Sequence, residues 1–225
     1  SRGLGDVYKR QNNLMLVNLQ ENIDSKVSEL KSTYQYIFNS ARFLQSRRSY
    51  QNNDVYFRSN ASEFLKELQT YVNSLDSELE VMVYYTEKDY IITQATANSS
   101  EFLYVRHKEA GSNIEKGKWL EHLSARYSNQ FLISSTLSVD SVEPHLVYCN
   151  TIIGSYERIN IFVSISLNIA KRLATPLESR LLMISDPQGE EAWCSDDTVN
   201  LTDMHPVLQK SSYPLNTAQE KYICT

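Results

Sequence analysis

Apolar residues recur at seven-residue intervals along residues 14–44. Two interleaved series carry this pattern, namely Leu16, Ile23, Leu30, Ile37 and Leu44, and Leu19, Val27, Tyr34 and Ala41. The other positions are mostly Asn, Gln, Ser, Lys and Glu, so a single narrow apolar stripe results. This spacing is typical of a long α-helix that packs along a partner. At ~1.5 Å per residue we expect a rod of roughly 45 Å, which packs on a downstream domain of its own chain, on a second copy, or on both.

Helical periodicity returns in three shorter segments. A helix is predicted over residues 59–75, followed by short helices over residues 98–108 and 119–127. The apolar face of the first of these consists of Ala61, Phe64, Leu65, Leu68, Val72 and Leu75. Each helix therefore has one face that can cover a sheet.

Strand signals lie between and after these helices. Residues 79–85 and 90–94 are rich in β-branched and aromatic side chains, and the polar residues 86–89 between them predict a hairpin. Three further strands are expected over residues 131–135, 145–153 and 158–166. Their alternation suits an antiparallel sheet with one face on a core and one face available.

A second module is expected beyond Thr175-Pro176. Residues 180–185 and 190–195 flank Asp186-Pro-Gln-Gly189, whose Pro and Gly positions fit a type I turn. Residues 196–212 suggest a loop and a short helix, and residues 221–225 suggest the beginning of another strand. We therefore predict an α+β fold: a long N-terminal helix packed on an antiparallel sheet module, followed by a smaller, incomplete second module.

Composition excludes several classes of function. The net charge is −5 and no Lys/Arg run occurs, so this portion is not expected to bind nucleic acid. No apolar run reaches the ~18–20 residues of a membrane span. The four histidines lack metal-ligand spacing, and no Gly-rich phosphate loop or nucleophile elbow is present. We predict no catalytic residue, no metal and no cofactor, hence no enzyme.

The cysteines do not predict a disulfide framework. Cys149, Cys194 and Cys224 are too few and too scattered for a set of bridges or for a zinc site. A single bridge between Cys194 and Cys224 and buried free thiols both remain open.

Four segments, together with the order of the elements, resemble a double Cache sensor. They are LEVMVYYTEKDYIIT at 79–93, Gly117-Lys-Trp119 followed by FLI at 131–133, IFVSISLNI at 161–169 and LMISDPQG at 182–189. Double Cache sensors are paired PAS-like extracytoplasmic modules of bacterial membrane receptors. The resemblance implies two PAS-like modules, membrane spans outside this stretch, and a location at the cell membrane with this portion extracytoplasmic.

The resemblance also implies domain boundaries. Residues 12–48 would be the long signalling helix, residues 49–175 the membrane-distal Cache module, and residues 176–225 the start of the membrane-proximal module. Residues 1–11, SRGLGDVYKRQ, resemble a translated sequencing adapter, so we expect them to be foreign to the native protein.

The function implied is ligand sensing with a conformational signal passed to a cytoplasmic output. The wording YYTEKDYIIT resembles Firmicutes regulators with an AraC-type DNA-binding output. The alternatives are a histidine kinase or chemoreceptor output, or a secreted small-molecule-binding protein without output. An unknown small molecule is the expected partner, and a homodimer could form through the stripe from Leu16 to Leu44.

In Cache domains the ligand pocket lies between the sheet of the distal module and the short helices inserted between its strands, here residues 98–108 and 119–127. The resemblance therefore makes four aromatic and three basic side chains candidates for ligand binding. These candidate ligand-binding residues are Trp119, Tyr84, Tyr127, Tyr148, Arg106, His107 and Arg126. The alternative is that the aromatic residues pack the core and the charges form a solvated face, because pocket and core aromatics look alike in sequence. Amino-acid-binding Cache domains carry an Arg close before a Trp-Tyr pair. Lys118 and Leu120 flank Trp119 instead, so amino-acid sensing is not expected.

Overall fold

A computed structural model of the protein describes residues 2–75, 78–138, 140–168, 183–185, 192–194, 213–216 and 221–224. The chain divides into two compact units. One is Leu30–Ser166, which we call the central unit, and the other joins Ser1–Glu29 to Leu167–Thr225. Among the described residues, no helix has both the length and the apolar character needed to cross a membrane.

Three helices begin the chain: α1 (Arg2–Asn39), α2 (Ala41–Arg48) and α3 (Asp54–Asn73). The predicted long helix is broken at Ser40, whose backbone is extended and whose hydroxyl accepts a hydrogen bond from the N–H of Phe43 at 3.1 Å. Serine is a favoured N-cap because its side chain satisfies an otherwise unpaired N–H of the first turn. The break turns the apolar face, so Phe43 is buried while Ala41 is exposed and Leu44 only half-buried. The prediction that Ala41 and Leu44 continue the stripe is therefore wrong.

The stripe itself is present up to the break. Its buried members are Ile23, Val27, Leu30, Tyr34 and Ile37. Leu30 and Ile37 are 0% exposed within the single chain, so these positions cannot also form the dimer contact proposed from the sequence. The side chains of Leu16 and Leu19 lie outside the described residues.

The central unit contains a six-stranded antiparallel sheet in the order β3-β2-β1-β6-β5-β4. Its strands are β1 (Leu79–Tyr85), β2 (Tyr90–Thr93), β3 (Ala97–Ser99), β4 (Gln130–Ser134), β5 (His145–Ile153) and β6 (Arg158–Ser166). The predicted turn is a short 3-10 helix, η1 (Thr86–Lys88), closed by Asp89 in the left-handed region at φ 46°. Strand β3 was not predicted, and it pairs with β2 at the edge of the sheet.

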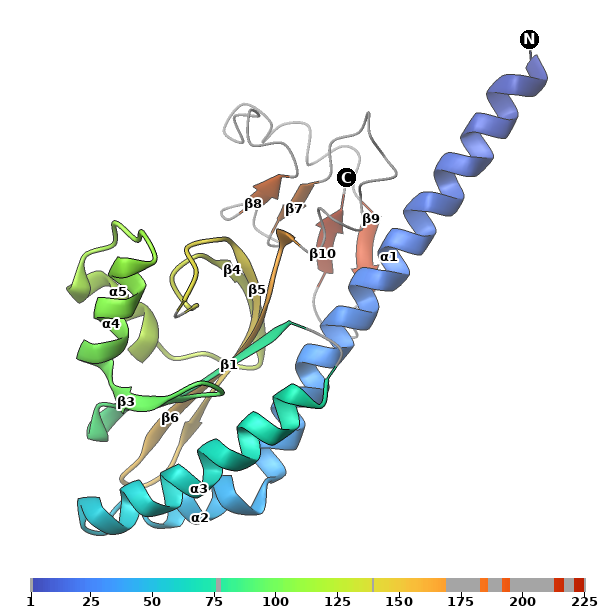
Figure 1. Cartoon of the computed structure of the whole chain (residues 1–225). Coiled ribbons are helices and arrows are strands. Elements are labelled where there is room, and N and C mark those ends of the chain that lie inside the picture. Colours follow the sequence, from blue (N-terminus) through green and yellow to red (C-terminus); the bar gives the residue numbers. More distant parts are fainter. Residues whose placement is uncertain are drawn as a thin grey trace. The chain divides into compact units, whose positions relative to one another are not determined.

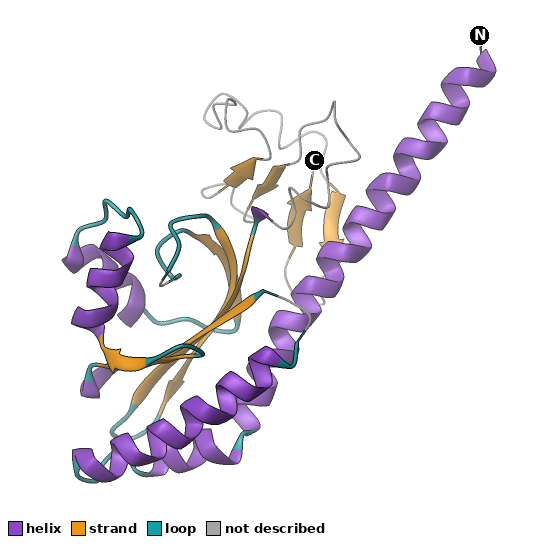
Figure 2. Ribbon diagram, viewed as in Figure 1, coloured by secondary structure: helices purple, strands orange, loops and turns teal. Residues whose placement is uncertain are grey.

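Helices α2 and α3, together with the part of α1 from Leu30 onward, cover one face of this sheet (Figures 1 and 2). The Tyr85 ring of β1 packs edge-on against Phe57 of α3 at 5.1 Å, and Tyr148 of β5 packs edge-on against Tyr34 of α1 at 5.4 Å. Phe43 of α2 contacts α3 through a tilted ring pair at 5.6 Å, which joins the two helices into one layer.

Two shorter helices, α4 (Ser100–Glu109) and α5 (Lys116–Ser124), cover the opposite face (Figure 1). Helix α4 begins after Ser99, whose hydroxyl accepts from the N–H of Phe102 at 3.4 Å. Helix α5 begins and ends earlier than predicted and places Trp119 and Leu123 on its buried side. A PAS-like layer order results, with the sheet between two helical coverings.

The other unit contains a four-stranded sheet in the order β8-β7-β10-β9. Its strands are β7 (Met183–Ser185), β8 (Ala192–Cys194), β9 (Tyr213–Asn216) and β10 (Lys221–Cys224). The predicted hairpin is confirmed as the pair β7–β8, and the predicted last strand as β10, whereas β9 was not predicted. The side chains of Cys194 and Cys224 lie outside the described residues, as those of Leu16 and Leu19 do. The short helix suggested within residues 196–212 falls outside the described residues.

Candidate functional site

An apolar cluster lies between the sheet and helices α4 and α5, in the space where the sequence placed a pocket. Its buried members are Met82, Tyr84, Ile91, Leu103, Trp119, Leu123, Leu137, Val147, Cys149 and Phe162. The partly buried Tyr104, Ile114, Leu120, Tyr127 and Leu132 pack against it. The structure thus brings together three predicted aromatic residues, Tyr84, Trp119 and Tyr127. We call this set of side chains the excursion core.

Trp119 lies at the centre of the excursion core and is fully buried. Its indole Nε1–H donates to the carbonyl oxygen of Thr136 at 3.0 Å, so its polar atom is satisfied. The ring lies 6.1 Å from that of His107 at an angle of 24°, and 5.6 Å from Tyr104. A residue of this size, held at its edge by a hydrogen bond, determines where α5 sits on the sheet.

His107 is the other fully buried polar member of this region, at 0% exposure. Neither of its ring nitrogens makes a hydrogen bond of acceptable geometry. Burial lowers the pKa of His107 below 6.5, and the nearby backbone of Ser138 opposes this decrease only in part. The imidazole is therefore neutral at pH 7 and retains hydrogen-bonding capacity inside an apolar environment, which is costly unless a polar group meets it.

Tyr84 and Tyr127 face the same core from the sheet and from the loop after α5. The Tyr84 hydroxyl donates to Asp89 at 3.3 Å, and burial together with this carboxylate raises the pKa of Tyr84 to about 12. The Tyr127 hydroxyl donates to the carbonyl oxygen of His122 at 2.6 Å, and its ring packs edge-on against Phe162 at 5.4 Å. The Tyr84 phenol therefore stays protonated at neutral pH.

The two candidate arginines do not enter the excursion core. Arg106 leaves the end of α4 and pairs with Asp140 at 2.6 Å, both side chains being more than a third exposed. Arg126 is exposed in the loop after α5. A charged ligand contact by either residue would have to occur at the rim of the cluster.

Tyr148 lies on the opposite face of the sheet from Trp119. It is buried between α1 and β4, with ring centroids 5.4 Å from Tyr34 and 4.8 Å from Phe131. Side chains alternate along a strand, and the neighbouring residues Val147 and Cys149 are the ones that face Trp119. Tyr148 therefore cannot share a pocket with the other three aromatic residues.

A polar group that the sequence did not nominate borders the excursion core. Glu80 accepts a hydrogen bond from the Ser138 hydroxyl at 2.8 Å and lies 3.6 Å from Nε2 of His145. The other ring nitrogen of His145, Nδ1, is 2.8 Å from the carbonyl oxygen of Glu143. The alternation of side chains along β1 could have identified Glu80 from the sequence, because it puts Glu80 on the same face of the strand as Tyr84.

Acceptors on both sides of the His145 ring favour its doubly protonated form. Burial by itself would lower the pKa of His145, but the Glu80 carboxylate and the Glu143 carbonyl raise it above 6.5. Burial likewise opposes ionisation of Glu80, yet His145 and Ser138 hold the pKa of Glu80 below 4.5. Between these two pKa values the groups form an ion pair in which His145 is buried and Glu80 is 31% exposed.

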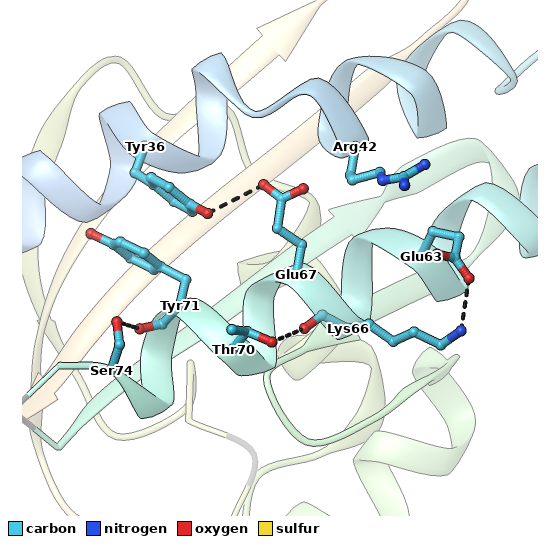
Figure 3. Close-up of a pocket in the computed structure, with 8 residues that line it drawn as sticks. All are labelled: Tyr36, Arg42, Glu63, Lys66, Glu67, Thr70, Tyr71 and Ser74. Carbon is cyan, nitrogen blue, oxygen red and sulfur yellow. Dashed lines mark hydrogen bonds and ion pairs between the residues drawn. The ribbon is translucent and has the colours of Figure 1, made fainter.

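A surface groove lies elsewhere, along α1 and α3 (Figure 3). Its volume is about 520 Å³, and it is lined by Tyr36, Arg42, Glu63, Lys66, Glu67, Thr70, Tyr71 and Ser74. Tyr36 and Tyr71 stack with ring centroids 3.6 Å apart, and the Tyr36 hydroxyl donates to Glu67 at 3.3 Å. Lys66 pairs with Glu63 at 2.7 Å. The polar groups that line the groove largely form hydrogen bonds and ion pairs with one another, so no charge of one sign is concentrated there.

A second groove of about 440 Å³ lies between α2 and the β5–β6 turn, where Arg47 pairs with Glu157. Neither of these two grooves includes a residue nominated from the sequence. Within the described part of the chain, no cluster of three or more His, Cys, Asp or Glu side chains could hold a metal ion.

Comparison with known proteins identifies similar solved structures. The sensor domain of the histidine kinase DctB from V. cholerae superimposes with a TM-score of 0.51 at 10% sequence identity, covering 89% of this chain and 74% of that one. The sensory domain of the Campylobacter jejuni chemoreceptor Tlp3 (CcmL) gives a TM-score of 0.46 at 11% identity, covering 98% and 94%. The α+β, Cache-like fold expected from the sequence is therefore confirmed by the DctB likeness. No protein-family model matches the chain, and no curated protein matches it in sequence.

Proposed function

We propose that this chain is the ligand-sensing, extracytoplasmic region of a bacterial transmembrane regulator. The observation that carries the proposal is the fold that it shares with the DctB sensor domain, in which a sheet lies between a helical layer and a shorter helical covering. The sensing site is the excursion core together with the adjacent His107, because aromatic side chains there meet an imidazole whose nitrogens lack a hydrogen bond of acceptable geometry. A small molecule with one hydrogen-bonding group would satisfy that imidazole.

The long helix α1 is the element suited to carry the signal. Its 38 residues make a continuous rod of about 57 Å at 1.5 Å per residue. The buried side chains of Leu30, Tyr34 and Ile37 pack the C-terminal part of α1 into the central unit. A shift of the sheet would therefore displace this part of the helix. A ligand that binds one arrangement more tightly than another would shift the population between them.

The output that we propose is an AraC-type DNA-binding region, supported by the wording of residues 84–93. A histidine kinase or chemoreceptor output is the alternative, and a secreted binding protein without output is a further one. The flanking gene sequence distinguishes all three. A helix-turn-helix pair after a membrane span supports the first, a kinase or coiled-coil hairpin supports the second, and a nearby stop codon with a cleavable leader supports the third.

A homodimer through α1 remains part of this proposal only for the segment before the central unit. Leu14 and Val17 are 63% and 50% exposed there, in contrast to the buried positions from Leu30 onward. Sedimentation of the wild-type chain and of a Leu14→Ser, Val17→Ser variant tests this contact. A dimer that persists in the variant would place the contact elsewhere.

Thermal unfolding in the presence of small molecules tests the sensing function. A panel of organic acids, amines, sugars and nucleobases is added to the 225-residue chain, and the midpoint temperature is measured. A ligand present at 100 times its Kd stabilises the folded state by about 2.7 kcal/mol, which gives a clear shift. Tyr148→Phe is the matched control, because this residue lies on the other face of the sheet.

We expect His107→Leu to abolish the shift while Tyr148→Phe retains it. Absence of any hit across the panel, or a shift that His107→Leu leaves unchanged, would contradict sensing at the excursion core.

A further inference from the structure

One side chain, Asn150 of β5, joins helix α1 to the loop that follows α5. Its Nδ2 amide donates to the hydroxyl oxygen of Tyr34 on α1 at 2.6 Å. Its Oδ1 accepts from the backbone N–H of Asn129 at 3.2 Å. A single planar amide therefore uses both of its ends, one on the helical layer and one on the loop of residues 125–129, which we call the α5 loop.

The α5 loop is held firmly to the ends of two strands. Tyr127 and Thr151 exchange two hydrogen bonds, the Tyr127 N–H to the Thr151 hydroxyl at 2.8 Å and the Thr151 N–H to the Tyr127 carbonyl at 2.9 Å. Asn160 of β6, fully buried, donates to the carbonyl oxygens of Leu123 and Ala125 at 2.6 and 2.9 Å. These carbonyls belong to the C-terminal end of α5, where helices leave acceptors unpaired. The end of α5 cannot shift without the α5 loop.

A second contact runs parallel to the first. Asn129 adopts the left-handed conformation at φ 47°, which Asn tolerates better than most residues. Its side-chain oxygen accepts from the Tyr148 hydroxyl at 3.2 Å, and the Tyr148 ring packs edge-on against Tyr34. The α5 loop thus reaches the same turn of α1 through an amide and through an aromatic ring.

We propose that Asn150 and Tyr148 form a coupling joint that passes a displacement of α5 to the turn of α1 around Tyr34. This rests on the proposed sensing function, because it requires that a molecule entering the excursion core moves α5. Trp119, at the centre of that core, belongs to α5, so any rearrangement of the core acts on this helix first. Asn150 is a positioning residue, since it touches no residue of the excursion core in the contacts described above. In this proposal Tyr148, on the face of the sheet that the helices α1 to α3 cover, connects Asn129 to Tyr34.

A cavity variant supplies a defined probe in place of the unidentified ligand. Trp119→Ala leaves an indole-shaped space in an apolar environment, and such spaces bind small aromatic molecules. Indole is added, and hydrogen exchange is measured for the amides of α5 and for residues 30–39 of α1. We expect indole to slow exchange in both segments, by about tenfold in α1, in the Trp119→Ala background.

Both contacts of the joint are then removed by Asn150→Ala together with Tyr148→Phe, which takes away the hydrogen bond to Asn129; this pair, called the Asn150→Ala background below, is combined with Trp119→Ala. The coupling joint predicts that indole still protects α5 but that the protection of α1 falls to less than twofold. Thr33→Val is the matched control. Thr33 is a buried neighbour of Tyr34 whose hydroxyl contacts Tyr71 of α3, at 3.5 Å, and not the sheet. The tenfold protection of α1 should survive in that background.

Full protection of α1 in the Asn150→Ala background, or none in Trp119→Ala alone, would overturn the proposal. If Trp119→Ala does not fold, Tyr127→Phe replaces it, since it removes only the hydrogen bond to the carbonyl of His122. Faster exchange in α1 that disappears in the Asn150→Ala background would then support the joint, and unchanged exchange in α1 would overturn it. Because the probe is indole, the result is independent of the ligand screen, so failure of the sensing function and failure of the joint can be told apart.

Discussion

Tyr84 and Tyr85 are adjacent in β1, and their hydroxyl groups form hydrogen bonds on opposite faces of the sheet. Tyr84 donates to Asp89 at 3.3 Å, on the side of α4 and α5, while Tyr85 shares a hydrogen bond with Ser46 of α2 at 2.5 Å. The alternation of a strand separates the two side chains. One tyrosine therefore belongs to the excursion core, and the other anchors the helical layer.

This relationship predicts unequal costs for removing the two hydroxyl groups. Tyr85→Phe should lower the free energy of unfolding by about 1 kcal/mol, because its hydroxyl is fully buried and leaves Ser46 with one partner fewer. Tyr84→Phe should cost less, since its hydrogen bond is long. Urea unfolding of the two variants checks this, and equal costs would contradict it.

The Glu80–His145 ion pair predicts a pH window of maximum stability. The folded-state pKa of His145 is raised above 6.5, so its contribution is complete below pH 6.5 and is lost as pH rises through the raised value. The folded-state pKa of Glu80 is lowered below 4.5, so its contribution is complete above pH 4.5 and is lost as pH falls through the lowered value. The pair should stabilise most between about pH 4.5 and 6.5.

His145→Gln measures this contribution. The midpoint temperature of the variant should fall furthest below that of the wild type within the window, and the difference should shrink above pH 7. A difference that stays constant from pH 5 to pH 9 would show that the ion pair does not titrate with folding.

His107 predicts the opposite pH dependence. Burial lowers its pKa, so the neutral ring is the stable form, and stability should decrease as pH falls below 6.5. His107→Leu should be neutral or stabilising at pH 7, because it removes buried ring nitrogens that lack hydrogen-bond partners. It should also reduce the loss of stability between pH 6.5 and 5. Thermal unfolding across this range is the measurement, and marked destabilisation by His107→Leu at pH 7 would reveal a partner for the ring.

We predict that position 154 tolerates only glycine, because the side chain of Glu157 occupies the space that a Cβ would need. A Cβ at this position would lie 2.6 Å from Cγ of Glu157, which pairs with Arg47. Gly154→Ala should therefore displace Glu157 and destabilise the protein by about 1–2 kcal/mol.

In a Glu157→Ala background the same substitution should become neutral or stabilising, because alanine restricts the unfolded chain and no longer meets an obstacle. Urea unfolding of the four proteins gives the interaction energy between the two sites. Equal effects of Gly154→Ala in both backgrounds would exclude the steric explanation.

Local periodicity predicted most of the elements of the central unit. The boundaries of β1, β5 and β6 agree with the sequence prediction, since β-branched and aromatic residues are concentrated in these segments. Strand β3 escaped prediction because its three residues carry no apolar pattern and are held by pairing with β2. The break at Ser40 escaped because the heptad pattern continues through it, whereas the extended Ser40 interrupts the helix and its hydroxyl, by accepting from the Phe43 N–H, caps the start of a new one.

The sequence by itself determined most of the helices and strands, and that Trp119, Tyr84 and Tyr127 are aromatic residues available for one core. Only the tertiary structure decided that Tyr148 lies on the other face and that His107 is buried without a hydrogen-bond partner. The pairing of β1 with β6 and the joining of Tyr34 to Asn129 through Asn150 were likewise decided there. The physical reason is range: periodicity reports contacts within a few residues, while these relationships join residues far apart in the chain through register and packing.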